Sequence, residues 1–163
     1  MTVLNAAGSC VNAQFKEPVE EFSGCRITLV PQEHIEFIWP KVREMLAPAI
    51  ERAHGRWTEQ DVLDQLLSGK QFLWLAYRND GAISSAVTTL ISQYPSARLL
   101  GIQFAGGTDM QLWSASGMAV MKKFAADMGC SGIETGGRSG WGRYLERFGF
   151  KQYIVICEHW FEE

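Results

Sequence analysis

The spacing of apolar positions changes several times along the chain, and each change predicts a new element. Residues 25–30 alternate β-branched and polar side chains, which is typical of a strand, and Pro31 ends the pattern. Apolar residues then recur at helical spacing over about 33–55. Because proline lacks a backbone N–H, we expect a break in this helical stretch at Pro40 and a kink at Pro48.

A second, shorter helix is predicted over residues 62–67. Thr58 and Asp61 stand ahead of it at the spacing of a capping box, with aspartate in place of the usual glutamate. Gly69 follows the last apolar position, and glycine commonly ends a helix because it accepts the left-handed conformation.

The following part of the chain has the two-residue period of strands. Strands are predicted over 72–77, 83–91 and 99–105. The connections at 79–81 and 94–96 contain the Gly, Asn, Pro and Ser residues that favour turns. Three consecutive strands joined by short turns predict an antiparallel meander.

Helical spacing returns after the meander. A helix is predicted over 113–128, and Gly129 is expected to end it. Thr108 and Gln111 are predicted to form a capping box at its start. A strand over 130–135 follows this helix in the prediction.

The last elements follow the glycine-rich segment 136–140. A short helix is predicted over 141–148, with Ser139 as its N-cap and Gly149 at its end. Residues 152–161 alternate in a strand-like way, so a final strand is expected there.

The order of these elements predicts an α+β fold, layered as in α/β proteins. It has a mixed sheet with an antiparallel meander and helices on both faces. The length of 163 residues fits one domain, which we expect over 25–163. Residues 1–24 are small and polar with no sustained period, and they are expected to form an irregular arm.

Composition and charge disfavour several classes of protein. Hydrophobic residues make up 47% of the chain and charged residues 20%, which indicates a globular core and not a disordered chain. A net charge of −3 offers no basic face for nucleic acid. No apolar run approaches the roughly 18 residues needed to cross a membrane. The first residues lack the pattern of a signal peptide. The cysteine and histidine spacings match no metal site.

Three segments in the second half of the chain carry a family resemblance. Residues 121–130 end in Gly-Cys, residues 132–134 read Gly-Ile-Glu, and residues 144–150 end in Phe-Gly-Phe. In this order they resemble the carboxyl half of the GCN5-related N-acetyltransferase (GNAT) family. The resemblance implies a GNAT-like fold from residue 25 onward.

Shorter segments resemble a narrower group within that family. Residues 55–57, 105–107 and 137–141 are similar to a GNAT-like group encoded in phage and prophage genomes. Members of that group tend to lie among head-assembly genes. This resemblance implies protein partners or self-association, and a location in the virion or the host cytoplasm.

The GNAT resemblance also implies a cradle for the pyrophosphate of acetyl-coenzyme A at the start of the helix after the meander. The candidate cofactor-binding residues are Gly106, Gly107, Gln111 and Arg138. The family's glycine-rich signature is degenerate here, because residues 108–114 contain neither glycine nor arginine. Asp109 would place a negative charge beside the phosphates. The two glycines have the alternative role of making a sharp turn.

An active enzyme of this family needs a general acid for the departing thiolate and a base for the amine. The resemblance places the acid, often a tyrosine, at Leu145. Tyr144 lies one residue away, about 100° around the helix, and is the candidate acid. Glu134 is the candidate base. One predicted strand follows the last helix where the family usually has two, so the acceptor site is expected to be open or completed by another subunit.

Two arginine-tryptophan pairs are candidates for an interaction surface. Arg56 and Trp57 lie at a predicted helix end, and Arg138 and Trp141 flank a glycine-rich turn. Arginine and aromatic residues together are typical of interface hot spots. Alternatively, Arg138 binds a phosphate or carboxylate through both guanidinium nitrogens, or stacks on Trp141 as an ordinary surface residue.

Two functions are compatible with these patterns. The degenerate loop, the displaced tyrosine and the short carboxyl end favour a non-catalytic virion or assembly component that binds no cofactor. The alternative is an acetyl-coenzyme A-dependent N-acetyltransferase with an atypical pyrophosphate loop and an unknown amine substrate. Neither interpretation involves nucleic acid, a membrane or a metal.

Overall fold

A computed structural model describes residues 2–4, 10–12, 25–152, 154 and 156–161 of the chain. Its main elements are β3 (Cys25–Leu29), α1 (Ile35–Glu51), α2 (Glu59–Leu67), β4 (Gln71–Arg78), β5 (Ile83–Gln93), β6 (Arg98–Gly107), α3 (Met110–Asp127), β7 (Gly132–Thr135) and α4 (Ser139–Leu145). Short 3-10 helices cover Gln32–His34 and Glu146–Phe148. None of the helices in the described part of the chain is long and apolar enough to span a membrane.

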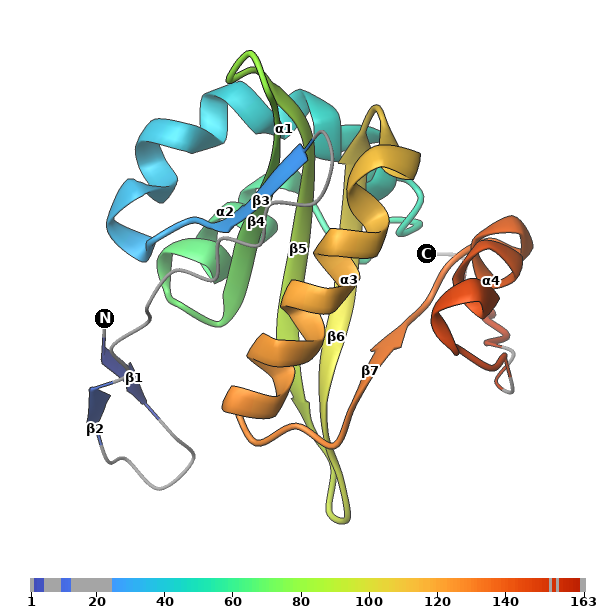
Figure 1. The fold of residues 1–163 in the computed structure, drawn as a ribbon. Coiled ribbons are helices and arrows are strands. Elements are labelled where there is room, and N and C mark those ends of the chain that lie inside the picture. The colour runs from blue at the N-terminus through green and yellow to red at the C-terminus, as the bar shows by residue number, and fades with distance from the viewer. Residues whose placement is uncertain (1, 5–9, 13–24, 153, 155, 162–163) are drawn as a thin grey trace.

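The five strands form one mixed sheet in the order β3-β4-β5-β6-β7. Antiparallel pairing joins β3 to β4, β4 to β5 and β5 to β6, and β7 pairs parallel to β6. Helices α1 and α2 cover one face, and α3 and α4 lie on the other (Figure 1). The predicted meander and the α+β class with helices on both faces are confirmed.

Strand β4 lies at the centre of the core, because its alternate side chains reach both layers. Phe72 and Trp74 pack with α3, whereas Leu73 and Leu75 pack with α1 and α2. The indole Nε1 of Trp74 donates a hydrogen bond to Thr89 Oγ1 at 2.9 Å. Burial on both faces explains why this strand is almost continuously apolar in sequence.

Helix α1 runs through both of its prolines without a break, so the interruption expected at Pro40 is wrong. The helix buries one complete face, made by Ile35, Trp39, Val42, Leu46 and Ile50. Packing of such a face supplies most of the stability of a helix in a protein, and here it outweighs the backbone hydrogen bonds that the prolines remove.

One of the two predicted capping boxes is confirmed, and the other is wrong. At α2, Thr58 and Asp61 exchange both capping bonds as predicted. At α3 the box of Thr108 and Gln111 is wrong, because the helix begins after Asp109, whose φ of 57° is left-handed. The Thr108 side chain instead faces the Ser84 carbonyl oxygen at 3.4 Å. The N-cap predicted for the last helix is also wrong. Helix α4 begins at Ser139 itself, and its N-cap is Arg138.

The carboxyl-terminal segment differs most from the prediction. Its described residues, 152, 154 and 156–161, form no strand. Glu158 instead contacts His54 Nδ1 at 2.9 Å and forms an ion pair with Arg56. The Arg56 guanidinium lies over the Trp160 ring. These contacts hold the segment against the loop between α1 and α2 (Figure 1).

The amino-terminal region is described only in part. Residues Thr2–Leu4 (β1) and Cys10–Asn12 (β2) pair as an antiparallel hairpin, where the sequence predicted an irregular arm. The remainder of the predicted arm, residues 1, 5–9 and 13–24, lies outside the described residues. The division into an arm and one domain over 25–163 stays a prediction.

The first residue of β4, Gln71, leads to a prediction about stability. Its side chain is only 2% exposed, and neither amide atom has a hydrogen-bond partner within the described structure. An unsatisfied buried amide costs roughly 1–3 kcal/mol. We therefore expect Gln71→Met to raise the free energy of unfolding by about 1 kcal/mol in urea denaturation. The exposed Gln93→Met serves as the control and should change little. A less stable Gln71→Met would contradict the assignment of an unsatisfied amide.

Candidate functional site

Strands β6 and β7 pair over only part of their length and then separate (Figure 1). The parallel ladder runs from Leu99 opposite Gly132 to Ile102 opposite Thr135. Within the described part of the chain, residues 103–107 of β6 continue without a partner on this side. The backbone N–H and C=O groups of these residues that point away from β5 form an open sheet edge. We call the place where β6 and β7 separate the fork.

A β-bulge explains why the strands separate there. Thr88 pairs with Phe104 and Thr89 with Ile102, so Gln103 is an extra residue in β6. A bulge bends its strand and reverses which face the following side chains occupy. Ile102 accordingly packs on the α3 side, whereas Phe104 packs on the α1 side. The bulge therefore turns β6 away from β7 at the fork.

Thr135 closes the ladder at the base of the fork. Its Oγ1 donates a hydrogen bond to the Ile102 carbonyl oxygen at 3.0 Å and accepts one from Trp141 Nε1 at 3.4 Å. The last residue of β7 is therefore connected to α4, and this contact fixes the position of α4 beside the fork.

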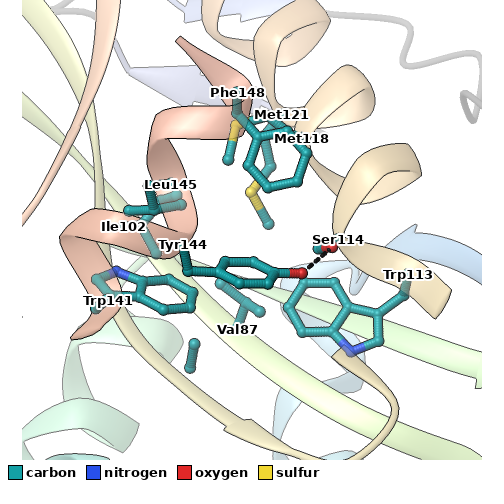
Figure 2. A pocket seen from close by; sticks show the side chains of 11 residues that line it. Val87, Ile102, Trp113, Ser114, Met118, Met121, Trp141, Tyr144, Leu145 and Phe148 are labelled. Carbon is teal, nitrogen blue, oxygen red and sulfur yellow. Dashed lines mark hydrogen bonds between the residues drawn. The ribbon is translucent and has the colours of Figure 1, made fainter. Parts of the chain in front are cut away.

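A small apolar cavity lies between β6, α3 and α4 (Figure 2). Its volume is about 20 Å³, enough for about one water molecule. Most of its lining is apolar, with Val87, Ile102, Met118, Met121 and Phe148 among the lining side chains. Two hydroxyl groups, those of Ser114 and Tyr144, interrupt this apolar surface.

Tyr144 points into this cavity from α4. Its Oη lies 2.6 Å from Ser114 Oγ in α3. A dashed line marks this hydrogen bond in Figure 2. The neighbouring Leu145 is 3% exposed and packs in the core. Tyr144 therefore brings a hydroxyl group to the cavity. Leu145, which stands at the family's usual position for the acid, has no polar group to offer.

The start of α3 carries an ion pair that the sequence pattern did not reveal. Arg78, the last residue of β4, donates from Nε to Asp109 Oδ2 at 2.7 Å. Its Nη2 also donates to Thr108 Oγ1 at 3.1 Å. The hydrogen bond from Arg78 is the main cause that lowers the pKa of Asp109, and the same bond raises the pKa of Arg78. The negative charge of Asp109 is thus neutralised locally.

The backbone at the same helix end can bind an anion. The first N–H groups of an α-helix have no acceptor within the helix. In the described structure the Asp109 side chain makes no capping bond to them, because it faces Arg78. The N–H groups of Met110 and Gln111 therefore stay available beside a cationic side chain, and the positive end of the helix dipole adds to their field.

The two candidate glycines of the loop are required by close packing. A Cβ on Gly106 would lie 1.7 Å from the carbonyl oxygen of Met45 in α1. Gly107 has a φ of +114°, and a Cβ there would lie 2.3 Å from the Ser84 carbonyl oxygen. Gly106 lets β6 approach α1, and Gly107 lets the chain turn between β6 and α3. Either glycine could contact a cofactor only through its backbone groups.

The other cofactor candidates lie at the surface. Gln111 is exposed in the first turn of α3. Arg138 is exposed at the start of α4, where it precedes the first helical residue. Among the described residues, no group of three or more His, Cys, Asp or Glu side chains could hold a metal ion.

The candidate base Glu134 lies apart from the cavity. It lines a wide groove along the outer edge of β7, together with Cys130 and Phe150. The Tyr94 hydroxyl donates to both of its carboxylate oxygens at 3.0 Å. The structure thus places Glu134 and Tyr144 in different pockets, which share only Phe148 among their lining residues.

The predicted interaction residues are divided between core and surface. The Trp57 ring packs edge-on against Phe104 at 5.9 Å, and Trp141 stacks on Tyr144 at 5.9 Å. Both tryptophans are partly buried and join the two core clusters. Arg56 is exposed but paired with Glu158. Their role as an interaction surface stays a prediction.

Sequence reasoning missed Arg78, Ser114 and Thr135. A signal for Arg78 was present, because β4 and β6 run in the same direction in a meander and therefore end at the same side of the sheet. Ser114 and Thr135 had no local signal, since their contacts depend on how α4 packs after its glycine-rich loop.

Similarity to known proteins is found at the level of structure. No protein-family model matches the chain, and no curated protein matches its sequence. The aminoglycoside N-acetyltransferase AAC(6')-Iy, bound to a bisubstrate analogue containing coenzyme A, matches with a TM-score of 0.63 at 14% identity, over 86% of this chain and 99% of that one.

Two further solved structures match over similar lengths. The aminoglycoside 6'-N-acetyltransferase AAC(6')-Ih from Acinetobacter baumannii has a TM-score of 0.61 at 12% identity, over 86% of this chain and 99% of that one. The glucosamine-6-phosphate N-acetyltransferase from Arabidopsis thaliana has a TM-score of 0.56 at 12% identity, over 85% and 99%.

These matches bear on the two functions drawn from the sequence. They show that the chain has a GNAT-like fold, as the resemblance predicted. The main interpretation, a non-catalytic virion or assembly component, is contradicted, because the matched structures are acetyltransferases. The absence of a cofactor that went with that interpretation loses its support as well.

Proposed function

We propose that the chain is an acetyl-coenzyme A-dependent N-acetyltransferase that acts on an amine. The observation that carries the proposal is the Tyr144 hydroxyl, which α4 presents in an apolar cavity beside the fork, 2.6 Å from Ser114 Oγ. A hydroxyl held in an apolar pocket suits a general acid. The matched structures with a GNAT-like fold support the same reaction class.

The chemistry of the donor groups fits the pyrophosphate of coenzyme A. The available N–H groups of Met110 and Gln111 lie at the positive end of α3, where phosphates bind favourably. Arg78 supplies a guanidinium next to them and offsets the charge of Asp109. These residues would hold the pyrophosphate, and they stand in for the glycine-rich signature that the sequence lacks.

The open edge of β6 fits the rest of the cofactor. The pantetheine arm carries two amide groups, and the backbone groups of residues 103–107 that face away from β5 offer donors and acceptors for an extended amide chain. The cavity of about 20 Å³ is too small to hold the arm, so this edge is the part of the fork that would bind it.

The residues of the chain have distinct roles in the proposed reaction. Acetyl-coenzyme A, when bound, supplies an acetyl group activated as a thioester. Tyr144 holds a proton at Oη for the departing sulfur, and the apolar lining around it keeps bulk water away. Glu134, the base expected from the sequence, faces a different pocket from Tyr144, so in this proposal the attacking amine gives its proton to solvent. The products are an N-acetyl amide and a free thiol.

The ion pair at the start of α3 gives a prediction about cofactor affinity. Asp109→Asn removes a negative charge and leaves Arg78 free to contact phosphate. Since charges at a helix end are worth about 0.3–1 kcal/mol, we expect the Kd for acetyl-coenzyme A to fall about two- to fivefold in calorimetry. The control is Asp127→Asn at the other end of the same helix, where Asp127 pairs with Lys123. An unchanged or raised Kd in Asp109→Asn would contradict this role.

The proposed activity is tested by amine-dependent release of free thiol. Purified protein is mixed with acetyl-coenzyme A and a panel of amines that includes aminoglycosides, amino sugars and lysine peptides. We expect at least one amine to give thiol release with stoichiometric N-acetylation by mass spectrometry. The absence of transfer to every amine, together with no acetyl-coenzyme A binding, would overturn the proposal.

Several expectations from the sequence remain proposals beside this function. We propose that residues 25–163 form one domain that contains the whole site. Membership of the phage-encoded group, self-association or protein partners, and a location in the host cytoplasm are proposed on the sequence resemblance alone. The exposed Arg138 is proposed as a further phosphate contact.

A further inference from the structure

Four groups hold the side chain of Tyr144, and Figure 2 shows Trp141, Phe148 and Ser114 among them. Trp141 stacks parallel to its ring, with an interplanar angle of 9°, and Phe148 meets it edge-on at 6.0 Å. The Arg147 guanidinium lies 4.2 Å from the ring centroid. Ser114 contacts the hydroxyl at 2.6 Å. Three of these contacts fix the plane of the ring, and Ser114 alone among them determines where the hydroxyl hydrogen can point.

The position of Ser114 in α3 makes this contact specific. A serine within a helix commonly bonds back to a carbonyl of the preceding turn. Ser116 in the same helix does so, to the Trp113 carbonyl oxygen at 3.0 Å. Ser114, only 8% exposed, instead reaches across to α4, thirty residues along the chain. Without Ser114 Oγ, the Tyr144 hydroxyl would face a mainly apolar lining.

We propose that Ser114 is the positioning residue for Tyr144 and that its hydroxyl is the donor in this pair. Tyr144 Oη then accepts the hydrogen bond, and its own hydrogen is free to point toward the fork. When Tyr144 gives that proton to the departing sulfur, the negative charge stays on Oη. The hydrogen bond from Ser114 then becomes charge-assisted and stronger. Ser114 thus favours both the geometry and the charge that proton transfer requires. This inference rests on the proposed acetyltransferase function.

The test compares Ser114→Ala with Ser116→Ala, the matched change at a buried serine that does not contact Tyr144. A hydrogen bond to a charged group is worth roughly 1.5–3 kcal/mol, so Ser114→Ala should lower kcat about 10- to 100-fold. The Kd and KM for acetyl-coenzyme A should stay within twofold, and Ser116→Ala should keep the wild-type kcat. Melting temperatures identify any variant that is unfolded.

Two further variants separate positioning from a structural effect. Ser114→Thr retains the hydroxyl and should recover most of the lost kcat. In a Tyr144→Phe background, Ser114→Ala should cause no further loss, because the hydroxyl that it orients is gone. A kcat for Ser114→Ala equal to that of Ser116→Ala, or a full additional loss in the double variant, would overturn the inference while leaving the proposed function intact. A wild-type protein that transfers no acetyl group would overturn both.

Discussion

Tyr144→Phe is expected to lower kcat for acetyl transfer by about 10²- to 10⁴-fold, the usual contribution of a general acid. Phenylalanine retains the ring that packs between Trp141 and Phe148, so the fold and the affinity for acetyl-coenzyme A should be preserved. The loss should therefore appear in kcat and not in the binding constant, and it is measured from initial rates of thiol release under saturating cofactor.

The control for this variant is Tyr77→Phe, the same chemical change in another half-buried ring. Tyr77 lies on β4 on the α1 side of the sheet, and burial raises the pKa of its hydroxyl. The Tyr77 hydroxyl lies on the opposite face of the sheet from the cavity that contains Tyr144, so Tyr77→Phe should retain the wild-type rate. A Tyr144→Phe rate within fivefold of wild type would show that another group donates the proton.

The largest expected effect on stability comes from Gly106→Ala. Alanine would place its Cβ 1.7 Å from the Met45 carbonyl oxygen and 2.6 Å from the Met45 carbonyl carbon. Both are backbone atoms of a packed helix, so the clash is relieved only if β6 and α1 move apart. Overpacking of a core usually costs 1–3 kcal/mol, and we expect roughly 3 kcal/mol or more here, measured by urea denaturation.

The matched control is Gly136→Ala in the loop between β7 and α4. No described atom lies within 4 Å of a Cβ built on Gly136, so this substitution should change stability by less than about 0.5 kcal/mol. If Gly106→Ala were as well tolerated as Gly136→Ala, the close approach of β6 to α1 would be wrong, and with it the position of the open edge at the fork.

Much of the fold follows from local patterns in the sequence. The meander is encoded by alternation and turn residues, and β4 reads as a two-sided core strand. Local patterns fail where pairing depends on distant parts of the chain. Residues 152–161 alternate like a strand, but Ile154 is 64% exposed and Ile156 is 79% exposed, because Glu158 binds the loop at His54 and Arg56 instead.

The candidate site was predictable only in part. The sequence identified Tyr144 and the start of α3, because both follow from the family resemblance. The bulge at Gln103 has no signature in a two-residue period, yet it creates the fork. From the sequence, Asp109 was expected to repel the phosphates of the cofactor. In the structure β4 and β6 run in the same direction, and this brings Arg78 beside Asp109. Asp109 therefore does not place an unpaired negative charge at the start of α3.

The central claim is that the fork binds acetyl-coenzyme A. Isothermal titration of the wild-type protein with acetyl-coenzyme A tests it most directly. We expect saturable binding of one molecule per chain, with a Kd in the micromolar range typical of enzyme cofactor sites. The Kd should rise when Arg78→Ala removes the guanidinium beside α3. No saturable heat up to millimolar acetyl-coenzyme A would contradict the account.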